Sequence, residues 1–139
     1  MSNNHNELYR ELTEKMKEIA IIGSCESLLG WDERTYMPRG GAPSRADQVS
    51  YLAGLSHKKF TDPRIGEILG ELEKSPLVSD PLSDTAVNIN EIRYQYDKSV
   101  KIPQKLVEEI THTTSMARGS GWRRAGIQIF QNSCLGWKK

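Results

Sequence analysis

The chain has 139 residues, enough for one domain with a modest hydrophobic core. Its 19 basic and 18 acidic side chains give a formal net charge of +1, which argues against a nucleic-acid-binding surface. The mean hydropathy is −0.59, and the aliphatic run at residues 19–22 is far too short to cross a bilayer. We therefore expect a soluble protein with no nucleic-acid or membrane partner.

The first five residues lack the basic and apolar regions of a signal peptide. Two cysteines, Cys25 and Cys134, are too few for a disulfide framework. These features make a cytoplasmic location the default expectation.

Residues 5–29 carry apolar side chains at helical spacing and charged side chains on the opposite face, which predicts a long first helix. Gly23 is a weak point in this helix, costing about 1 kcal/mol relative to alanine unless a partner helix approaches closely there. Cys25 has no histidine at a suggestive distance, so we expect a small core side chain rather than a nucleophile. Gly30 is expected to end the helix.

The next segment is dense in residues that interrupt helices. Pro38 blocks helix continuation, and Gly40-Gly41 permits a sharp turn. Ser44-x-x-Asp47 resembles a capping box at the start of a second helix over residues 42–59. Composition alone favours an ordered connector over a binding site, and we expect Trp31 to be mostly buried beneath it, together with Met37.

Three more helices are predicted further along. Asp62-Pro63 is a typical helix start, and Ser83 can cap another helix after a linker at residues 74–81. Pro103 is expected to mark the start of a fifth helix. The expected core faces of these three helices contain Ile65, Ile68, Leu69 and Leu72; Val87 (or Ala86), Ile89, Ile92, Tyr96 and Val100; and Leu106, Val107, Ile110 and Ala117. Tyr94 should lie on the surface, opposite Tyr96.

No stretch alternates like a strand for long enough to count, so the predicted fold class is all-α, with about five largely antiparallel helices. Asp32, Glu33 and Asp47 could form a carboxylate cluster. Because Arg34, Arg39 and Arg45 lie near them in the sequence, we expect these acids to pair across the connector or to remain solvated.

The connector and the helix after it carry a motif: Leu-Gly-Trp-Asp, a threonine, Met-Pro-x-Gly-Gly-Ala, and then Arg-Ala-x-Gln and Leu-Ala-Gly-Leu. This pattern resembles the start of the thermostable (Taq-type) carboxypeptidases, zinc metallopeptidases that remove C-terminal residues from peptides. Shorter matches follow at residues 61–63, 90–93, 96–97, 102–103 and 106–109, so the resemblance covers roughly residues 5–118. The motif positions taken as structural are Gly30, Trp31, Asp32, Thr35, Met37, Pro38, Gly40, Gly41, Arg45 and Gln48.

The resemblance implies the N-terminal helical segment of a larger, mostly helical metallopeptidase. The full-length enzyme would use zinc, or another divalent metal, and act on a peptide substrate. A zinc peptidase needs His-Glu-x-x-His, because that spacing places both imidazoles on one helix face. The three histidines, His5, His57 and His112, are too far apart in sequence to form the pair. We therefore assign no catalytic, metal-binding or cofactor-binding residue to this chain and expect it to be inactive, truncated before the metal site.

An alternative is a non-catalytic helical interaction module derived from that family. In either case the apolar faces of the first, fourth and fifth helices lack part of what they would pack on in the parent. We therefore expect the chain to self-associate, for example as a homodimer, or to remain loosely packed.

The last 21 residues differ from the rest. Residues 119–139 hold four basic and no acidic side chains, which leaves residues 1–118 with 15 basic and 18 acidic groups, a net charge of −3. In a reading frame shifted by one base, each new codon consists of the last base of one original codon and the first two bases of the next. Read in this frame, the tail can encode Val-Glu-Ala-Arg, Asn-Ser-Asp-Phe-Ser and Leu-Pro-Trp-Leu-Glu-Lys. That reading resembles the family's continuation. We predict two regions: 1–118, a helical segment of the family, and 119–139, an out-of-frame or non-native tail created by a frameshift. The tail is expected to be irregular or mobile beyond about Ala117, with any helix there incidental.

Overall fold

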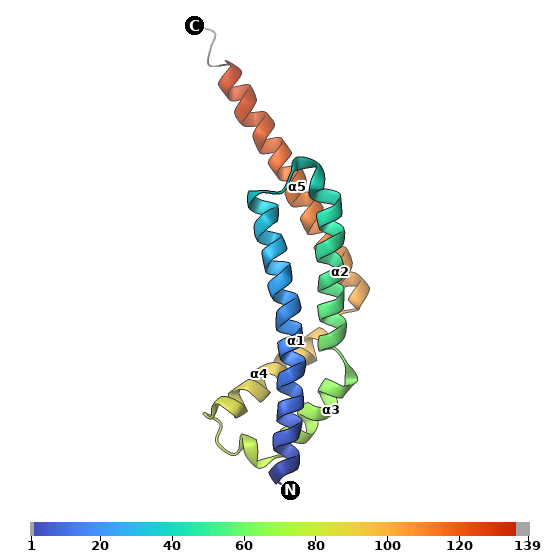
Figure 1. Cartoon of the computed structure of the whole chain (residues 1–139), viewed down its shortest axis with the longest axis vertical. Helices are drawn as coiled ribbons and strands as arrows, with labels where there is room; N and C mark the ends of the chain where they lie inside the picture. Colours follow the sequence, from blue (N-terminus) through green and yellow to red (C-terminus); the bar gives the residue numbers. More distant parts are fainter. Residues whose placement is uncertain (1, 136–139) are drawn as a thin grey trace.

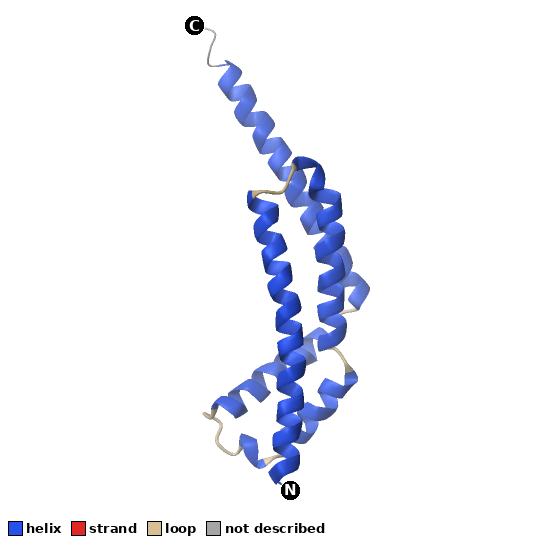
Figure 2. Ribbon diagram, in the orientation of Figure 1, coloured by secondary structure: helices blue, strands red, loops and turns tan. Residues whose placement is uncertain are grey.

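A computed structural model describes the backbone of residues 2–135 and the side chains of residues 4–38 and 40–119. The described residues form five α-helices and two short 3-10 turns, with no strand among them (Figures 1 and 2). The elements are α1 (Ser2–Thr35), η1 (Arg39–Gly41), α2 (Ala42–Phe60), α3 (Pro63–Leu72), η2 (Pro76–Val78), α4 (Asp84–Ser99) and α5 (Gln104–Leu135). The all-α prediction is confirmed.

Helices α1 and α2 form a long antiparallel hairpin. The ion pair between Lys59 and Glu18 (2.9 Å) joins the end of α2 to the middle of α1, and the pair between Arg45 and Asp32 joins the start of α2 to the end of α1. Helix α5 packs along the other side of α2 and is antiparallel to it. Its last turns run past the tip of the hairpin (Figure 1).

The hydrophobic core lies at the opposite end of the hairpin, where α3 and α4 pack against the first half of α1. All four residues predicted for the apolar face of α3 are buried, and each stabilises the fold by about 1.5–3 kcal/mol relative to exposure. The fully buried cluster consists of Leu12, Ile65, Ile68, Leu69, Leu72 and Ile89.

Two predicted helix starts are confirmed by their hydrogen bonds. The Asp62 carboxylate accepts from the backbone N–H of Arg64 (2.9 Å), and Pro63 is the first residue of α3. The Ser83 hydroxyl accepts from the backbone N–H of Ala86 (3.3 Å) at the start of α4. Such caps stabilise a helix by about 1 kcal/mol each, because they satisfy otherwise unpaired N–H groups.

Two predicted boundaries are wrong. Helix α1 does not end at Gly30 but continues to Thr35, since one glycine costs only about 1 kcal/mol and no helix breaker follows until Pro38. The capping box is also wrong, because α2 begins at Ala42 with Gly41 as its N-cap residue, so Ser44 is already helical.

Several predicted burials are wrong as well. Trp31 is 54% exposed rather than buried, and Cys25 is an exposed free thiol rather than a core residue. On α5, Leu106 and Ile110 are 45% and 56% exposed, so the predicted apolar face of that helix is only partly covered. On α4 the alternative residue, Ala86, is the buried one. Tyr94 is exposed and Tyr96 packs against the core, both as predicted.

The backbone beyond Ala117 is helical to Leu135, where we expected an irregular or mobile tail with at most an incidental helix. The side chains of the tail beyond residue 119, including both of its tryptophans and Cys134, lie outside the described residues.

Candidate functional site

The family-like motif lies at the tip of the α1–α2 hairpin. The end of α1 closes with backbone hydrogen bonds from Tyr36 and Met37 to the carbonyl oxygen of Asp32, both 3.0 Å long. The turn then passes Pro38 and η1 before α2 begins. The last turns of α1 contain Gly30, Trp31, Asp32 and Thr35; the turn contains Met37, Pro38, Gly40 and Gly41; and Arg45 and Gln48 lie near the start of α2.

Arg45 links the two helices of this hairpin. Its guanidinium donates to the Asp32 carboxylate and to the Leu29 carbonyl oxygen, each over 2.6 Å, and to the Gln48 amide oxygen over 3.0 Å. The Arg45 side chain is only 13% exposed, so these charge-assisted bonds are better shielded from water than a surface pair. This contact confirms the expected pairing of Asp32 across the connector and identifies Arg45 as a structural clamp.

A second polar cluster joins α1 to α5. The Glu33 carboxylate is 4% exposed; one oxygen accepts from the Ser115 hydroxyl (2.7 Å) and the other pairs with Arg118 (3.2 Å). We call these three residues the Glu33 cluster. Sequence reasoning placed Glu33 among the connector acids but missed both partners, because no local signal links residues 82 positions apart.

Asp47, the third acid of the predicted cluster, pairs with a residue that sequence reasoning did not connect to it. Its carboxylate lies 3.3 Å from Nε2 of His112 on α5. The three predicted acids therefore serve three different contacts and do not form one carboxylate site. Arg39 was expected among their partners, and its side chain lies outside the described residues.

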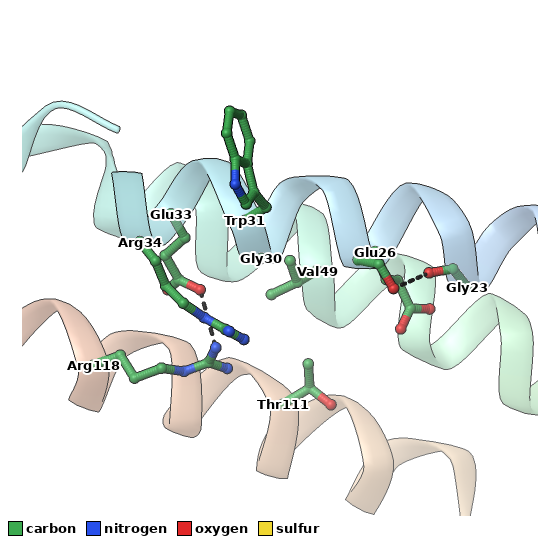
Figure 3. Close-up of a pocket in the computed structure, with 10 residues that line it drawn as sticks. Gly23, Glu26, Gly30, Trp31, Glu33, Arg34, Val49, Thr111 and Arg118 are labelled. Carbon is green, nitrogen blue, oxygen red and sulfur yellow. Dashed lines mark hydrogen bonds and ion pairs between the residues drawn. The ribbon is translucent and has the colours of Figure 1, made fainter. Parts of the chain in front are cut away.

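A pocket of about 500 Å³ opens between α1 and α5 (Figure 3). Val49 of α2 lies between the two helices, and Arg34 and Arg118 reach in from opposite walls. Glu26 also lines this α1–α5 pocket, and burial raises the pKa of its carboxyl above the usual value. Its full lining is Gly23, Glu26, Ser27, Gly30, Trp31, Glu33, Arg34, Val49, Thr111 and Arg118.

The described residues do not fit a catalytic zinc site. His5, His57 and His112 lie on three different helices, and Nε2 of His57 already lies 2.8 Å from the carbonyl oxygen of Ile102. Within the described part of the chain, no three His, Cys, Asp or Glu side chains gather closely enough to hold a metal ion. No helix there is both long and apolar enough to span a membrane.

Comparison with known proteins agrees with the motif at the hairpin tip. The sequence model of the family described as "Carboxypeptidase Taq (M32) metallopeptidase" matches residues 11–128. The chain is 45% identical over 117 residues to thermostable carboxypeptidase 1 of Thermus thermophilus and 30% identical over 128 residues to thermostable carboxypeptidase 1 of Pyrococcus furiosus. It is 25% identical over 116 residues to carboxypeptidase 1 of Bacillus subtilis.

These alignments cover 84%, 86% and 84% of this chain but only 23% of each relative, so the chain spans about a quarter of their length. The family match extends ten residues beyond the boundary expected near residue 118. Because the match includes most of the chain, the protein belongs to the Taq-type (M32) carboxypeptidase family of metallopeptidases.

Proposed function

We propose that this chain is the N-terminal helical part of a metallocarboxypeptidase, which uses zinc or another divalent metal to remove C-terminal amino acids from peptides. The observation that carries this proposal is a family match that spans only 23% of the relatives' length, in a sequence without His-Glu-x-x-His. The residues that hold the metal and bind the peptide would belong to the remainder of a family-length protein.

When bound there, the metal would polarise the scissile carbonyl and activate water. The residues of this chain would act as scaffold. Arg45 fixes the α1–α2 hairpin, and the Glu33 cluster fixes α5 against α1. Neither cluster has the composition of a hydrolytic centre, since each consists of ion-paired or hydrogen-bonded groups without a spare base or nucleophile.

The purified chain should therefore not hydrolyse peptides, even with added zinc or cobalt. The assay follows release of the C-terminal residue from a blocked dipeptide, with the Thermus thermophilus relative as positive control. Metal-dependent release that remains with this chain through several purification steps would contradict the proposal.

The alternative is a stand-alone helical interaction module. Its support is the number of large apolar side chains exposed on α1, α4 and α5. Such surfaces also favour self-association, for example a homodimer, which light scattering at several concentrations can detect. The DNA downstream distinguishes the two functions: an adjoining frame that encodes His-Glu-x-x-His supports the enzyme part, and unrelated sequence supports the module.

We further propose that residues 119–139 are read out of frame. The support is the shifted reading, in which Trp137-Lys138 must give glutamate and several other positions can restore family-like residues. A helical backbone to Leu135 is compatible with either frame. Resequencing the gene decides the question: if a one-base shift near codon 118 does not open a frame running to His-Glu-x-x-His, the frameshift proposal is wrong.

We propose that the protein is located in a reducing, cytoplasmic compartment. The support is Cys25, a free and exposed thiol, which would be prone to oxidation in a secreted protein. Cell fractionation with an antibody against the chain tests this location.

A further inference from the structure

One side of α1 carries a row of large apolar side chains that nothing in the described structure covers. Ile21 and Leu28 are 64% and 65% exposed, and Trp31 is 54% exposed. Residues 21 and 28 are seven positions apart, which is two helical turns, so they lie on the same side of α1. The Ser24 hydroxyl on this side donates to the Ile21 carbonyl oxygen (2.7 Å) of its own helix and therefore offers no donor outward.

The α1–α5 pocket lies on a different side of α1, because Gly30 is nine positions from Ile21, which is about half a turn around the helix axis. Trp31 borders both surfaces. Three small residues of α1, Gly23, Ser27 and Gly30, line the pocket. A Cβ atom placed on Gly23 would meet nothing within 4 Å. Small residues of this kind allow a neighbouring helix to approach closely, at the 8–10 Å separation of packed helices.

Two charged side chains of the pocket lack partners among the described residues. Oε1 of Glu26 is buried and accepts no hydrogen bond. Arg34 reaches back over Gly30, where a Cβ would lie 3.9 Å from its Nη2, and it makes no ion pair with any described residue. A buried polar atom without a partner is costly, so the missing neighbour should bring a donor to Glu26. Arg34 is exposed, and its guanidinium offers the same neighbour an ion pair.

We propose that a helix from the remainder of a family-length carboxypeptidase docks in the α1–α5 pocket, beside Trp31. This inference rests on the proposed function. The relatives contain more than three times as much chain outside the matched segment as within it, which supplies the helix. Helix α5 has already passed the pocket by Arg118, which pairs with Glu33 near the end of α1, so the chain that follows residue 118 leaves from the hairpin-tip end of the molecule. The docked helix would complete a four-helix arrangement with α1, α2 and α5.

The test is a chimera in which residues 1–118 of this chain replace the matched segment of the Thermus thermophilus relative. Gly23→Leu is introduced into both the chimera and the isolated chain. In the isolated chain the pocket is open and leucine is the better helix former, so the melting temperature should rise by roughly 3–6 °C. In the chimera the leucine would collide with the docked helix, and the melting temperature should fall.

Gly70→Leu is the matched control, because Gly70 is also helical and a Cβ there would meet nothing within 4 Å. It should raise the melting temperature in both proteins. Arg34→Gln provides a second readout: it should lower the melting temperature of the chimera by more than that of the isolated chain, where Arg34 only complements the C-terminal end of the α1 dipole.

The outcomes separate the two proposals. A chimera without peptidase activity contradicts the proposed function. An active chimera in which Gly23→Leu is as harmless as Gly70→Leu overturns the docking proposal alone. Dissociation of a dimer of the isolated chain by Gly23→Leu would assign the pocket to a second copy and would also overturn it.

Discussion

The hydrogen bond between Ser115 and Glu33 should be one of the strongest single contacts holding α5 to α1. Ser115 is fully buried, and its hydroxyl donates over 2.7 Å to a carboxylate whose side chain is 4% exposed. Water therefore cannot easily replace the donor in a Ser115→Ala variant. Hydrogen bonds to charged groups are worth about 1.5–3 kcal/mol. Because Arg118 still holds the other carboxylate oxygen, we expect a loss of about 2 kcal/mol, below the 3–5 kcal/mol of a fully broken buried pair.

The free energy of unfolding can be measured by urea titration followed by far-UV circular dichroism. One protein concentration is used throughout, because self-association would make stability depend on concentration. Thr114→Ala is the control on the neighbouring residue, whose hydroxyl is exposed and donates only to its own helix at Ile110 (2.7 Å). It should change stability by less than about 0.5 kcal/mol.

A double-mutant cycle isolates the contact. In a Glu33→Met background, which keeps side-chain length but removes the acceptor, Ser115→Ala should cost almost nothing. The reasoning fails if Ser115→Ala is as mild as Thr114→Ala, or if its cost is the same with and without the Glu33 carboxylate.

Three further predictions concern other contacts. Gly66→Ala should destabilise the chain by about 1–3 kcal/mol, because a Cβ there would lie 2.7 Å from Oη of Tyr96. Gly70→Ala should instead stabilise the chain by about 0.5–1 kcal/mol, because a Cβ there would meet nothing within 4 Å. Paired urea titrations compare the two variants. Burial raises the pKa of the Glu26 carboxyl, so its ionisation makes the folded state less stable once the pH rises through the folded pKa. Glu26→Gln should therefore raise the melting temperature at pH 7. This gain should vanish below the ordinary glutamate pKa of 4.5, where the carboxyl is protonated in both the folded and the unfolded state. Arg45→Lys should cost about 1–3 kcal/mol despite keeping the charge, because an ammonium cannot reproduce the three hydrogen bonds of the guanidinium; a melting temperature equal to wild type would count against the clamp.

The parts of the fold that the sequence predicted depend on interactions within a few residues. Asp62 and Ser83 cap helices two or three positions away, so both residues of each hydrogen bond are visible in one short window. The apolar face of α3 is similarly local, since its four buried residues span eight positions. Such short-range features do not depend on how the helices pack against one another.

Long-range pairs could not be predicted in this way. Glu33 and Ser115 are 82 residues apart, and nothing near either one signals the other. The same holds for Asp47 and His112, whose contact depends on the register of α5 along α2. Charge reasoning identified which residues needed partners, but only the packing of α5 determines which partners they have.

The exposure of Trp31 follows from a single boundary. If α1 ended at Gly30, Trp31 would begin a connector and could turn under it. Because α1 continues, each residue is rotated by 100° from the last. Arg45 of α2 holds the Leu29 carbonyl oxygen and the Asp32 side chain, which fixes that side of α1 against α2. Trp31, between them in sequence, must then point away from α2. The same rotation places Gly30 and Gly23, seven residues apart, on one side of α1, where they line the α1–α5 pocket. Because the sequence predicted a helix end at Gly30, it predicted neither the exposure of Trp31 nor the open pocket beside it.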